Sequence, residues 1–477
     1  MKKLAYCSII TLLVLMLIGL GFISTPANAS NHKWKFPYNP IIFVHGYSGS
    51  GQQFESQAMR FTSNGYPQNY IAVLEYDTST IVVGQPIPLS FFTPIWANLD
   101  LLIANLLTET GANQVDILGH SLGTDVMYGY LTSLPTRAAN VAHYVNIDGQ
   151  ANLPDGVPTL ALWAGADPPA FQAMGPRSMP GATNVTIPGV THVECATCAA
   201  SFLQMYQFFT GQVPETTDIL PEPSDHIRLA GRAIYFVQNL GVANSTLQIY
   251  KVNGHTGARI DTNPEATYAI GADGNWGPFM AKAGEHYEFV LVPTDNTPHH
   301  FYYEPFIRSD YLIRLLESPP GPTGLDYYTV TSANQSDLVI SRNREFWGDQ
   351  GVNNGVNNND ILAINGVNIV NAATCPLSSL INGIFVFGEG PDGVSNLNQP
   401  IPFFAAIPFL TGVDLYIPGA NPPDGRIRLV LMPRGGEGKM QVLNVPNWAS
   451  TTDRILIQFN DFLQREDIPC GNGAKYW

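Results

Sequence analysis

Residues 113–131 read NQVDILGHSLGTDVMYGYL and place one serine between two glycines. The apolar run at 115–118 has the length of one buried strand in a parallel sheet, and the residues after the glycines can continue as a helix. A turn this tight leaves no room for a Cβ at Gly119 or Gly123, two positions before and after Ser121. The five-residue pattern recurs by chance, but the strand and helix around it favour a nucleophile elbow. We therefore predict that Ser121 is a nucleophile.

Strand and helix patterns alternate through the first 210 residues. Apolar runs predict strands at 40–45, 70–76, 115–118, 143–147, 159–164 and 184–187. Helical spacing predicts helices at 94–110, 124–131 and 199–209, the first with Thr93 as N-cap and Pro94 in its first turn. Such alternation predicts a mostly parallel sheet with flanking helices.

Residues 78–95 form an irregular apolar connection in this first domain. They are too apolar for a bare surface loop, so we interpret them as a lid-like insertion or a rim that binds an apolar substrate. Ordinary core packing is the alternative.

The character of the chain changes after Gly211. Residues 213–225 are rich in proline and acidic residues and read as a linker, so the first domain is assigned to 30–212. Short alternating runs then predict a mostly-β domain over 226–477, a sandwich or barrel with one or two subdomains. One short helix is expected near 309–316. The Asn/Gly-rich stretch 349–360 matches no calcium-loop spacing and is expected to be a solvated turn.

The N-terminus predicts export. Lys2 and Lys3 precede an apolar run, and an Ala-x-Ala motif ends at Ala29. This arrangement is typical of a secretory signal peptide over residues 1–29. No later stretch is continuously apolar enough for a transmembrane segment. We therefore expect a secreted, extracellular protein.

The charge balance excludes some partners. The chain has 23 basic and 38 acidic residues, and the signal peptide contains two of the basic ones, so the processed chain carries a net charge of −17. This balance argues against nucleic acid as a partner.

Four cysteines remain after processing. Disulfides are expected in an exported chain, and the simplest pairing is Cys195–Cys198 with Cys375–Cys470. A single C-x-x-C pair without a second ligand pair favours neither zinc nor redox chemistry.

A serine nucleophile needs a base, which in turn needs a carboxylate. His192 is the candidate base, because it is the one histidine after Ser121 that follows a strand of the first domain and precedes its last helix. His120 is interpreted as support for the elbow. Asp148 and Asp167 each end a strand between Ser121 and His192, and the usual placement in this kind of sheet favours Asp167.

Two backbone N–H groups should form the oxyanion hole. One is that of Leu122, which follows the nucleophile. The other is expected from Tyr47 in the glycine-rich loop HGYSGSG (45–51), which follows the first strand.

Several motifs extend beyond the elbow. They are VHGYSGSGQQFESQAMRFTSNGYP (44–67), VDILGHSLGT (115–124), NIDG (146–149), GVPTLALWAG (156–165), VTHVEC (190–195) and IPFFAAIPFLTGVDLYIPG (401–419). Together they resemble the secreted lipases typified by a hyperthermophilic archaeal long-chain lipase, over nearly the whole processed chain.

This resemblance implies an α/β-hydrolase domain joined to a C-terminal β domain, with ester hydrolysis of acylglycerols at an oil–water interface and no metal or organic cofactor. It implies that the β domain helps to hold long acyl chains. In these lipases the acid lies in the segment matching IDG, so the resemblance favours Asp148 over Asp167. A polyester depolymerase, a phospholipase or a thioesterase would use the same residues, and a non-catalytic lipid- or polymer-binding protein is the alternative from another class.

Overall fold

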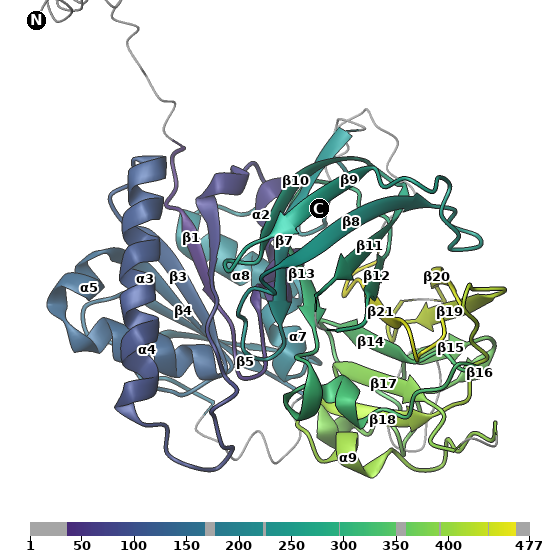
Figure 1. The fold of residues 1–477 in the computed structure, drawn as a ribbon. Helices are drawn as coiled ribbons and strands as arrows, with labels where there is room; N and C mark the ends of the chain where they lie inside the picture. The colour runs from purple at the N-terminus through teal and green to yellow at the C-terminus, as the bar shows by residue number, and fades with distance from the viewer. Residues whose placement is uncertain are drawn as a thin grey trace, which may run out of the picture. The chain divides into compact units, whose positions relative to one another are not determined.

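The computed structural model describes residues 36–166, 177–222, 226–294, 296–349, 359–390, 393–436 and 438–463 (Figure 1). All of them belong to one unit that begins at Phe36. The expected signal peptide (1–29), the alternative acid Asp167 and Cys470 lie outside these residues, as does most of the 349–360 stretch.

A six-stranded parallel sheet forms the first domain, in the order β2-β1-β3-β4-β5-β6. Its strands are β1 (Ile41–Val44), β2 (Ile71–Leu74), β3 (Val115–His120), β4 (Val141–Ile147), β5 (Thr159–Ala164) and β6 (Thr183–Ile187). All six coincide with the predicted strands. We call this domain, from β1 to the last helix at Thr210, the α/β domain.

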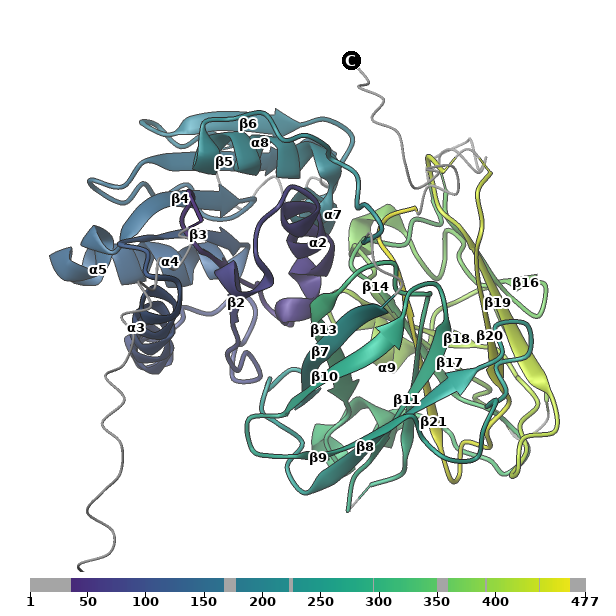
Figure 2. The ribbon, with the colours of Figure 1, turned by 90° about the horizontal axis from the view of Figure 1, so that it is seen from above.

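Helices cover both faces of this sheet (Figure 2). Ile41 and Phe43 of β1 pack against α2 (Glu55–Ser63), the six-residue α7 (His192–Thr197) and α8 (Ala199–Thr210). The alternate residues Ile42 and Val44 pack against α3 (Leu89–Thr110) and α4 (Leu122–Ser133), and α5 (Pro135–Ala139) follows α4. A strand buried on both faces explains why the sequence reads as continuous apolar runs.

The helix α3 begins five residues before the predicted start at Pro94, so Pro94 lies inside it. Aromatic packing accounts for the extra turn, because Phe91 contacts Tyr76 and Phe92 stacks on Trp96 with ring centroids 5.8 Å apart. Among the described residues, α3 alone is long and apolar enough to cross a membrane by length and composition, but its inner face packs on the sheet.

The remainder of the described chain, residues 226–463, is mostly β and is called the β region. It contains β7 (His226–Tyr235), β8 (Ser245–Val252), β9 (Ala266–Ile270), β10 (Asn275–Lys282), β11 (His286–Val292), β12 (His299–Tyr303), β13 (Asp310–Glu317), β14 (Leu338–Arg342), β15 (Ile361–Ile364), β16 (Val367–Asn368), β17 (Gly383–Phe387), β18 (Leu410–Asp414), β19 (Arg426–Met432), β20 (Gln441–Pro446) and β21 (Arg454–Phe459). Short helical turns occur at η4 (Leu325–Tyr328) and α9 (Pro402–Ala405).

Two sandwiches share one sheet in the β region. An eight-stranded sheet runs β18-β17-β14-β21-β12-β11-β8-β9. Its β12-β11-β8 part packs on the three-stranded sheet β10-β7-β13, and its β17-β14-β21 part packs on the four-stranded sheet β16-β15-β19-β20. The predicted mostly-β domain is therefore confirmed, and of the two architectures expected, sandwich or barrel, the structure has the sandwich.

The helix expected at 309–316 is wrong, because Asp310–Glu317 is strand β13. Ile313 and Leu315 pack in the core of the first sandwich, and the strand pairs in parallel with β7. Tertiary packing thus overrides a local sequence of good helix formers.

The described cysteines do not support the expected disulfides. Among the described residues Cys198 and Cys375 are thiols, which disagrees with the expected Cys195–Cys198 bond, whereas Cys470 of the other expected pair lies outside these residues. The Cys198 sulfur instead caps α8, where it accepts from the Ser201 backbone N–H at 3.4 Å.

Candidate active site

Ser121 occupies a strained turn between β3 and α4. Its backbone angles are φ 54° and ψ −122°, a conformation that a serine rarely adopts. A Cβ on Gly119 would lie 2.6 Å from the carbonyl oxygen of Gly123, and one on Gly123 would lie 2.4 Å from that of Val44. The two glycines are therefore required for the elbow, as the sequence predicts.

Asp148, at the end of β4, is paired with His192. Its Oδ2 accepts from His192 Nδ1 at 2.7 Å, and its Oδ1 accepts from the Ala164 backbone N–H at 2.8 Å and from Arg177. Both the Asp148 and the His192 side chains are buried. Because a carboxylate only accepts, the bond fixes the Nδ1–H tautomer and makes Nε2 the basic nitrogen.

His120 supports the backbone of His192. Its Nε2 donates to the His192 carbonyl at 2.9 Å, while its Nδ1 accepts from Gln53 Nε2 at 2.8 Å. Burial, reinforced by the neighbouring His192, lowers the pKa of His120 to about 3. The ring is therefore neutral and serves as a fixed link between Gln53 and the candidate base.

The loop 45–51 lies directly against the nucleophile. A Cβ on Gly46 would come within 2.9 Å of the Ser121 Cβ, so only glycine permits this approach. Tyr47 follows Gly46 and lines the same cavity as Ser121. Leu122 is the first residue of α4, at the helix end where backbone N–H groups have no intrahelical partner. Tyr47 thus lines the same cavity as Ser121 and Leu122 follows Ser121 in the chain, while their role as oxyanion-hole donors stays a prediction.

Side chains of the β region hold this loop in place through hydrogen bonds. Asn239 donates its amide N–H groups to the carbonyls of Gly49 at 2.8 Å and Tyr76 at 3.0 Å. Arg314 donates to Glu75 at 2.6 Å, and Glu75 in turn accepts from the Gly51 N–H at 3.1 Å. Burial opposes ionisation of Glu75, but Arg314 and His45 outweigh it, so its pKa lies below the ordinary value.

No motif or spacing in the sequence marks Asn239 or Arg314 as part of the site. They lie 190 and 239 positions from their partners Gly49 and Glu75.

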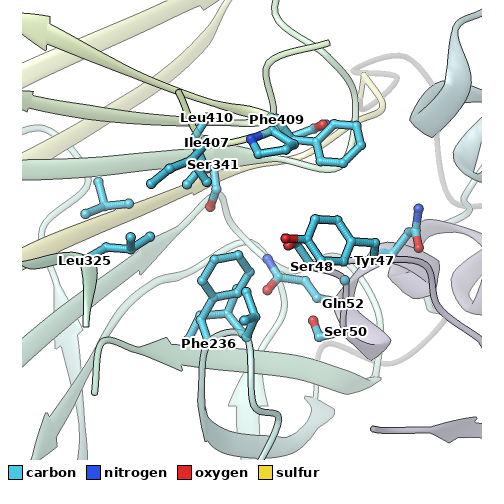
Figure 3. A pocket seen from close by; sticks show the side chains of 18 of the residues that line it. Tyr47, Ser48, Ser50, Gln52, Phe236, Leu325, Ser341, Ile407, Phe409 and Leu410 are labelled. Carbon is cyan, nitrogen blue, oxygen red and sulfur yellow. The ribbon is translucent and has the colours of Figure 1, made fainter. Parts of the chain in front are cut away.

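A cavity of about 400 Å³ contains Ser121 and His192 in its wall. Figure 3 shows other side chains that line it, among them Tyr47, Phe236 and Ile407. The α/β domain contributes the polar side, including Tyr47 and Gln52. The β region contributes both polar residues, including Glu317, Asp326 and Arg342, and the apolar ones that make up the apolar side, which are Phe236, Leu325, Val339, Phe385, Ile407, Phe409, Leu410 and Leu456. The rings of Phe409 and His192 are stacked, with their centroids 6.4 Å apart.

The described residues contain no group of three or more His, Cys, Asp or Glu side chains that could hold a metal ion. Asp360, at the end of the stretch considered for calcium, binds Arg342 at 3.0 Å and Arg434 at 2.7 Å instead.

The order of the parallel sheet and the elbow between β3 and α4 define the class of the first domain, an α/β hydrolase. Family models agree with this class. Residues 40–206 match the palmitoyl protein thioesterase model, residues 225–320 match the lipase C-terminal domain, and residues 324–463 match a further C-terminal domain model. These matches support a lipase-like α/β hydrolase that cleaves esters.

Solved structures that resemble parts of the chain include other hydrolases. A predicted CIB-like hydrolase from Thermoplasma acidophilum is 14% identical, with 35% of this chain and 84% of that chain covered and a TM-score of 0.25. A Pyrobaculum calidifontis esterase is 13% identical, with 37% and 77% covered and a TM-score of 0.28. An α/β hydrolase from the sediment metagenome of the Mar Chica lagoon, Morocco, is 16% identical, with 36% and 90% covered and a TM-score of 0.26.

Proposed function

We propose that this protein is a secreted serine carboxylester hydrolase, a lipase that cleaves medium- to long-chain acylglycerols through an acyl-enzyme. The observation that carries the proposal is the buried Asp148–His192 pair in the wall of an apolar cavity that also contains Ser121. An ester with an apolar acyl group is the substrate that suits both features.

The chemistry assigns one role to each residue. His192 takes the proton of the Ser121 hydroxyl as the oxygen attacks the ester carbonyl, and Asp148 stabilises the imidazolium that forms. The N–H groups of Leu122 and Tyr47 bind the oxyanion, each such donor contributing roughly 10²- to 10³-fold to kcat. His192 then returns the proton to the leaving alcohol. Water, activated by the same imidazole, releases the fatty acid.

The acyl chain is assigned to the apolar side of the cavity. Val339, Phe385 and Leu410 come from three neighbouring strands of the eight-stranded sheet and share one hydrophobic cluster with Leu325 and Ile407. Burying an acyl chain here contributes about 0.8 kcal/mol per methylene group. Longer chains should therefore bind more tightly until the cavity is filled.

A long-chain thioester is the second candidate substrate, because residues 40–206 match the palmitoyl protein thioesterase model. The same serine, histidine and aspartate would serve, since thioester and ester carbonyls pass through the same kind of tetrahedral intermediate. Hydrolysis of palmitoyl-CoA at a kcat/KM above that for p-nitrophenyl palmitate would favour this substrate over acylglycerols.

The main test is hydrolysis of p-nitrophenyl esters from two to eighteen carbons and of emulsified triacylglycerols. Wild type should cleave them and react covalently with a fluorophosphonate, whereas Ser121→Ala should fold normally and do neither. If wild type is inert to every ester and to the fluorophosphonate, a lipid- or polymer-binding role replaces the hydrolase proposal.

Secretion rests on the sequence of residues 1–29. N-terminal sequencing of the protein recovered from the medium of an expressing culture should give a start at Ser30. Retention of the whole chain inside the cell would reject this part of the proposal.

A further inference from the structure

The helix that carries the candidate base begins without a cap of its own. His192 is the first residue of α7, and Thr191 before it makes no side-chain capping bond. The Thr191 hydroxyl is buried without a hydrogen-bond partner among the described residues. The backbone N–H groups of the first turn therefore need acceptors from elsewhere.

Glu345 of the β region supplies these acceptors. Its Oε1 accepts from the Val193 N–H at 2.7 Å, and its Oε2 accepts from the Glu194 N–H at 3.3 Å. The residue is fully buried and lies 152 positions from Val193 in the chain. A carboxylate at this place suits the helix electrostatically as well, because the N-terminus of a helix attracts negative charge.

Arginines of the β region hold Glu345 in place. The Glu345 carbonyl accepts from Arg342 Nη2 at 2.5 Å and from Arg434, and both arginines also bind the buried Asp360. Burial opposes ionisation of Asp360, but Arg342 and Arg434 outweigh it and lower its pKa. Arg434 reaches across to α7, where its Nη2 lies 2.9 Å from Glu194.

Three residues then define where the His192 imidazole lies. Asp148 holds the ring, His120 holds the carbonyl, and Glu345 holds the next two N–H groups of the backbone. We propose that Glu345 is a positioning residue, which orients His192 toward Ser121 by capping α7 from the β region. This inference rests on the proposed function, in which His192 is the base.

The first test compares Glu345→Ala and Glu345→Gln with wild type on p-nitrophenyl butyrate. Displacement of the imidazole should lower kcat roughly 10- to 100-fold in Glu345→Ala, with KM changed by no more than about twofold. Glu345→Gln keeps one acceptor oxygen and should recover part of the lost kcat.

Glu288→Gln is the matched control. Glu288 is a buried carboxylate of the β region that binds Arg259 and His300 and does not touch α7. The substitution Glu288→Gln should lower the melting temperature, as Glu345→Gln should, but it should leave kcat within about twofold of wild type. The inference would be overturned if Glu288→Gln and Glu345→Gln lost kcat equally, or if Glu345→Ala kept the kcat of wild type.

The second measurement does not depend on turnover. The Nδ1 proton that His192 shares with Asp148 should give a downfield proton NMR signal in wild type, which should shift or broaden in Glu345→Ala and remain in Glu288→Gln. If wild type cleaves no ester, the proposed function fails, and this signal still tests the role of Glu345. An unchanged signal in Glu345→Ala would reject it.

Discussion

His192 Nδ1 lies 2.7 Å from Oδ2 of Asp148, although the two residues are 44 positions apart. Asp148 directly follows β4, the strand next to the nucleophile strand β3, and its φ of 50° turns the chain sharply at that point. The Ala164 N–H of the following strand holds the other carboxylate oxygen. The carboxylate is thus fixed from β5 while it faces the imidazole.

This pairing predicts opposite results for two conservative substitutions. Asp148→Asn keeps the shape but cannot hold the correct tautomer, so kcat should fall by roughly 10³- to 10⁴-fold. Asp167→Asn should keep kcat within about threefold of wild type. Steady-state hydrolysis of p-nitrophenyl butyrate measures both. A collapse in Asp167→Asn with Asp148→Asn active would assign the acid to Asp167.

Filling the apolar side of the cavity should separate long from short substrates. Ile407→Trp places a large ring in the cavity wall, so kcat/KM for p-nitrophenyl palmitate should fall roughly 10- to 100-fold. Hydrolysis of p-nitrophenyl acetate should change little. Ile260→Trp is the control, because Ile260 is 61% exposed. An equal loss for acetate and palmitate would place the acyl chain elsewhere.

Removing the amide of Asn239 should weaken catalysis on every substrate. Asn239→Gly keeps the positive φ of 57° but loses the bonds to the Gly49 and Tyr76 carbonyls, so the loop that carries Tyr47 is released. We expect kcat to fall roughly 10- to 100-fold, for acetate as well as palmitate esters. Asn244→Gly is the control, since Asn244 also has a positive φ, of 63°. Wild-type kcat in Asn239→Gly would contradict this role.

A chain that ends at Gln212 should lose short-chain activity together with long-chain activity. Such a truncation removes Asn239 and Arg314, which hold the loop 45–51, and Glu345, which caps α7. Full short-chain activity in a folded truncated protein would show that the α/β domain positions its own residues.

The buried His300 should make stability depend on pH. Burial alone would lower the pKa of His300, but Asp453 at 2.8 Å and Glu288 at 2.7 Å outweigh it and raise the pKa. A raised pKa stabilises the folded state fully below the unfolded value of about 6.5, and this contribution is lost as the pH rises through the folded value.

The substitution His300→Gln should therefore reduce the free energy of unfolding most at low pH. We expect the free energy of unfolding to fall by about 3–5 kcal/mol near pH 6, and the difference from wild type should shrink as the pH rises toward 9. Denaturant unfolding of both proteins between pH 6 and 9 measures this difference. A difference that stays constant or grows with pH would contradict the raised pKa.

The sequence predicted the parallel sheet correctly because each strand is a short apolar run bounded by turn residues. It misplaced the start of α3 and assigned β13 to a helix. In both cases contacts with distant residues decide the local conformation, as Ile313 and Leu315 do in the sandwich core. The expected disulfides were chosen by spacing alone, which contains no information on the geometry of the sulfurs.

The sequence by itself was enough to predict the nucleophile and the candidate base, and both assignments stay predictions. Ser121 needs two glycines within two residues, and His192 follows from the order of strands, so both patterns are contained in short segments. Only the tertiary structure decided which carboxylate among the described residues faces His192. It also showed that Asn239 and Glu345 of the β region hold the loop 45–51 and the helix α7. The contacts of Asn239 and Glu345 join residues more than 150 positions apart, where no spacing rule relates them. Their geometry depends on how the hydrophobic cores of the α/β domain and the β region pack together.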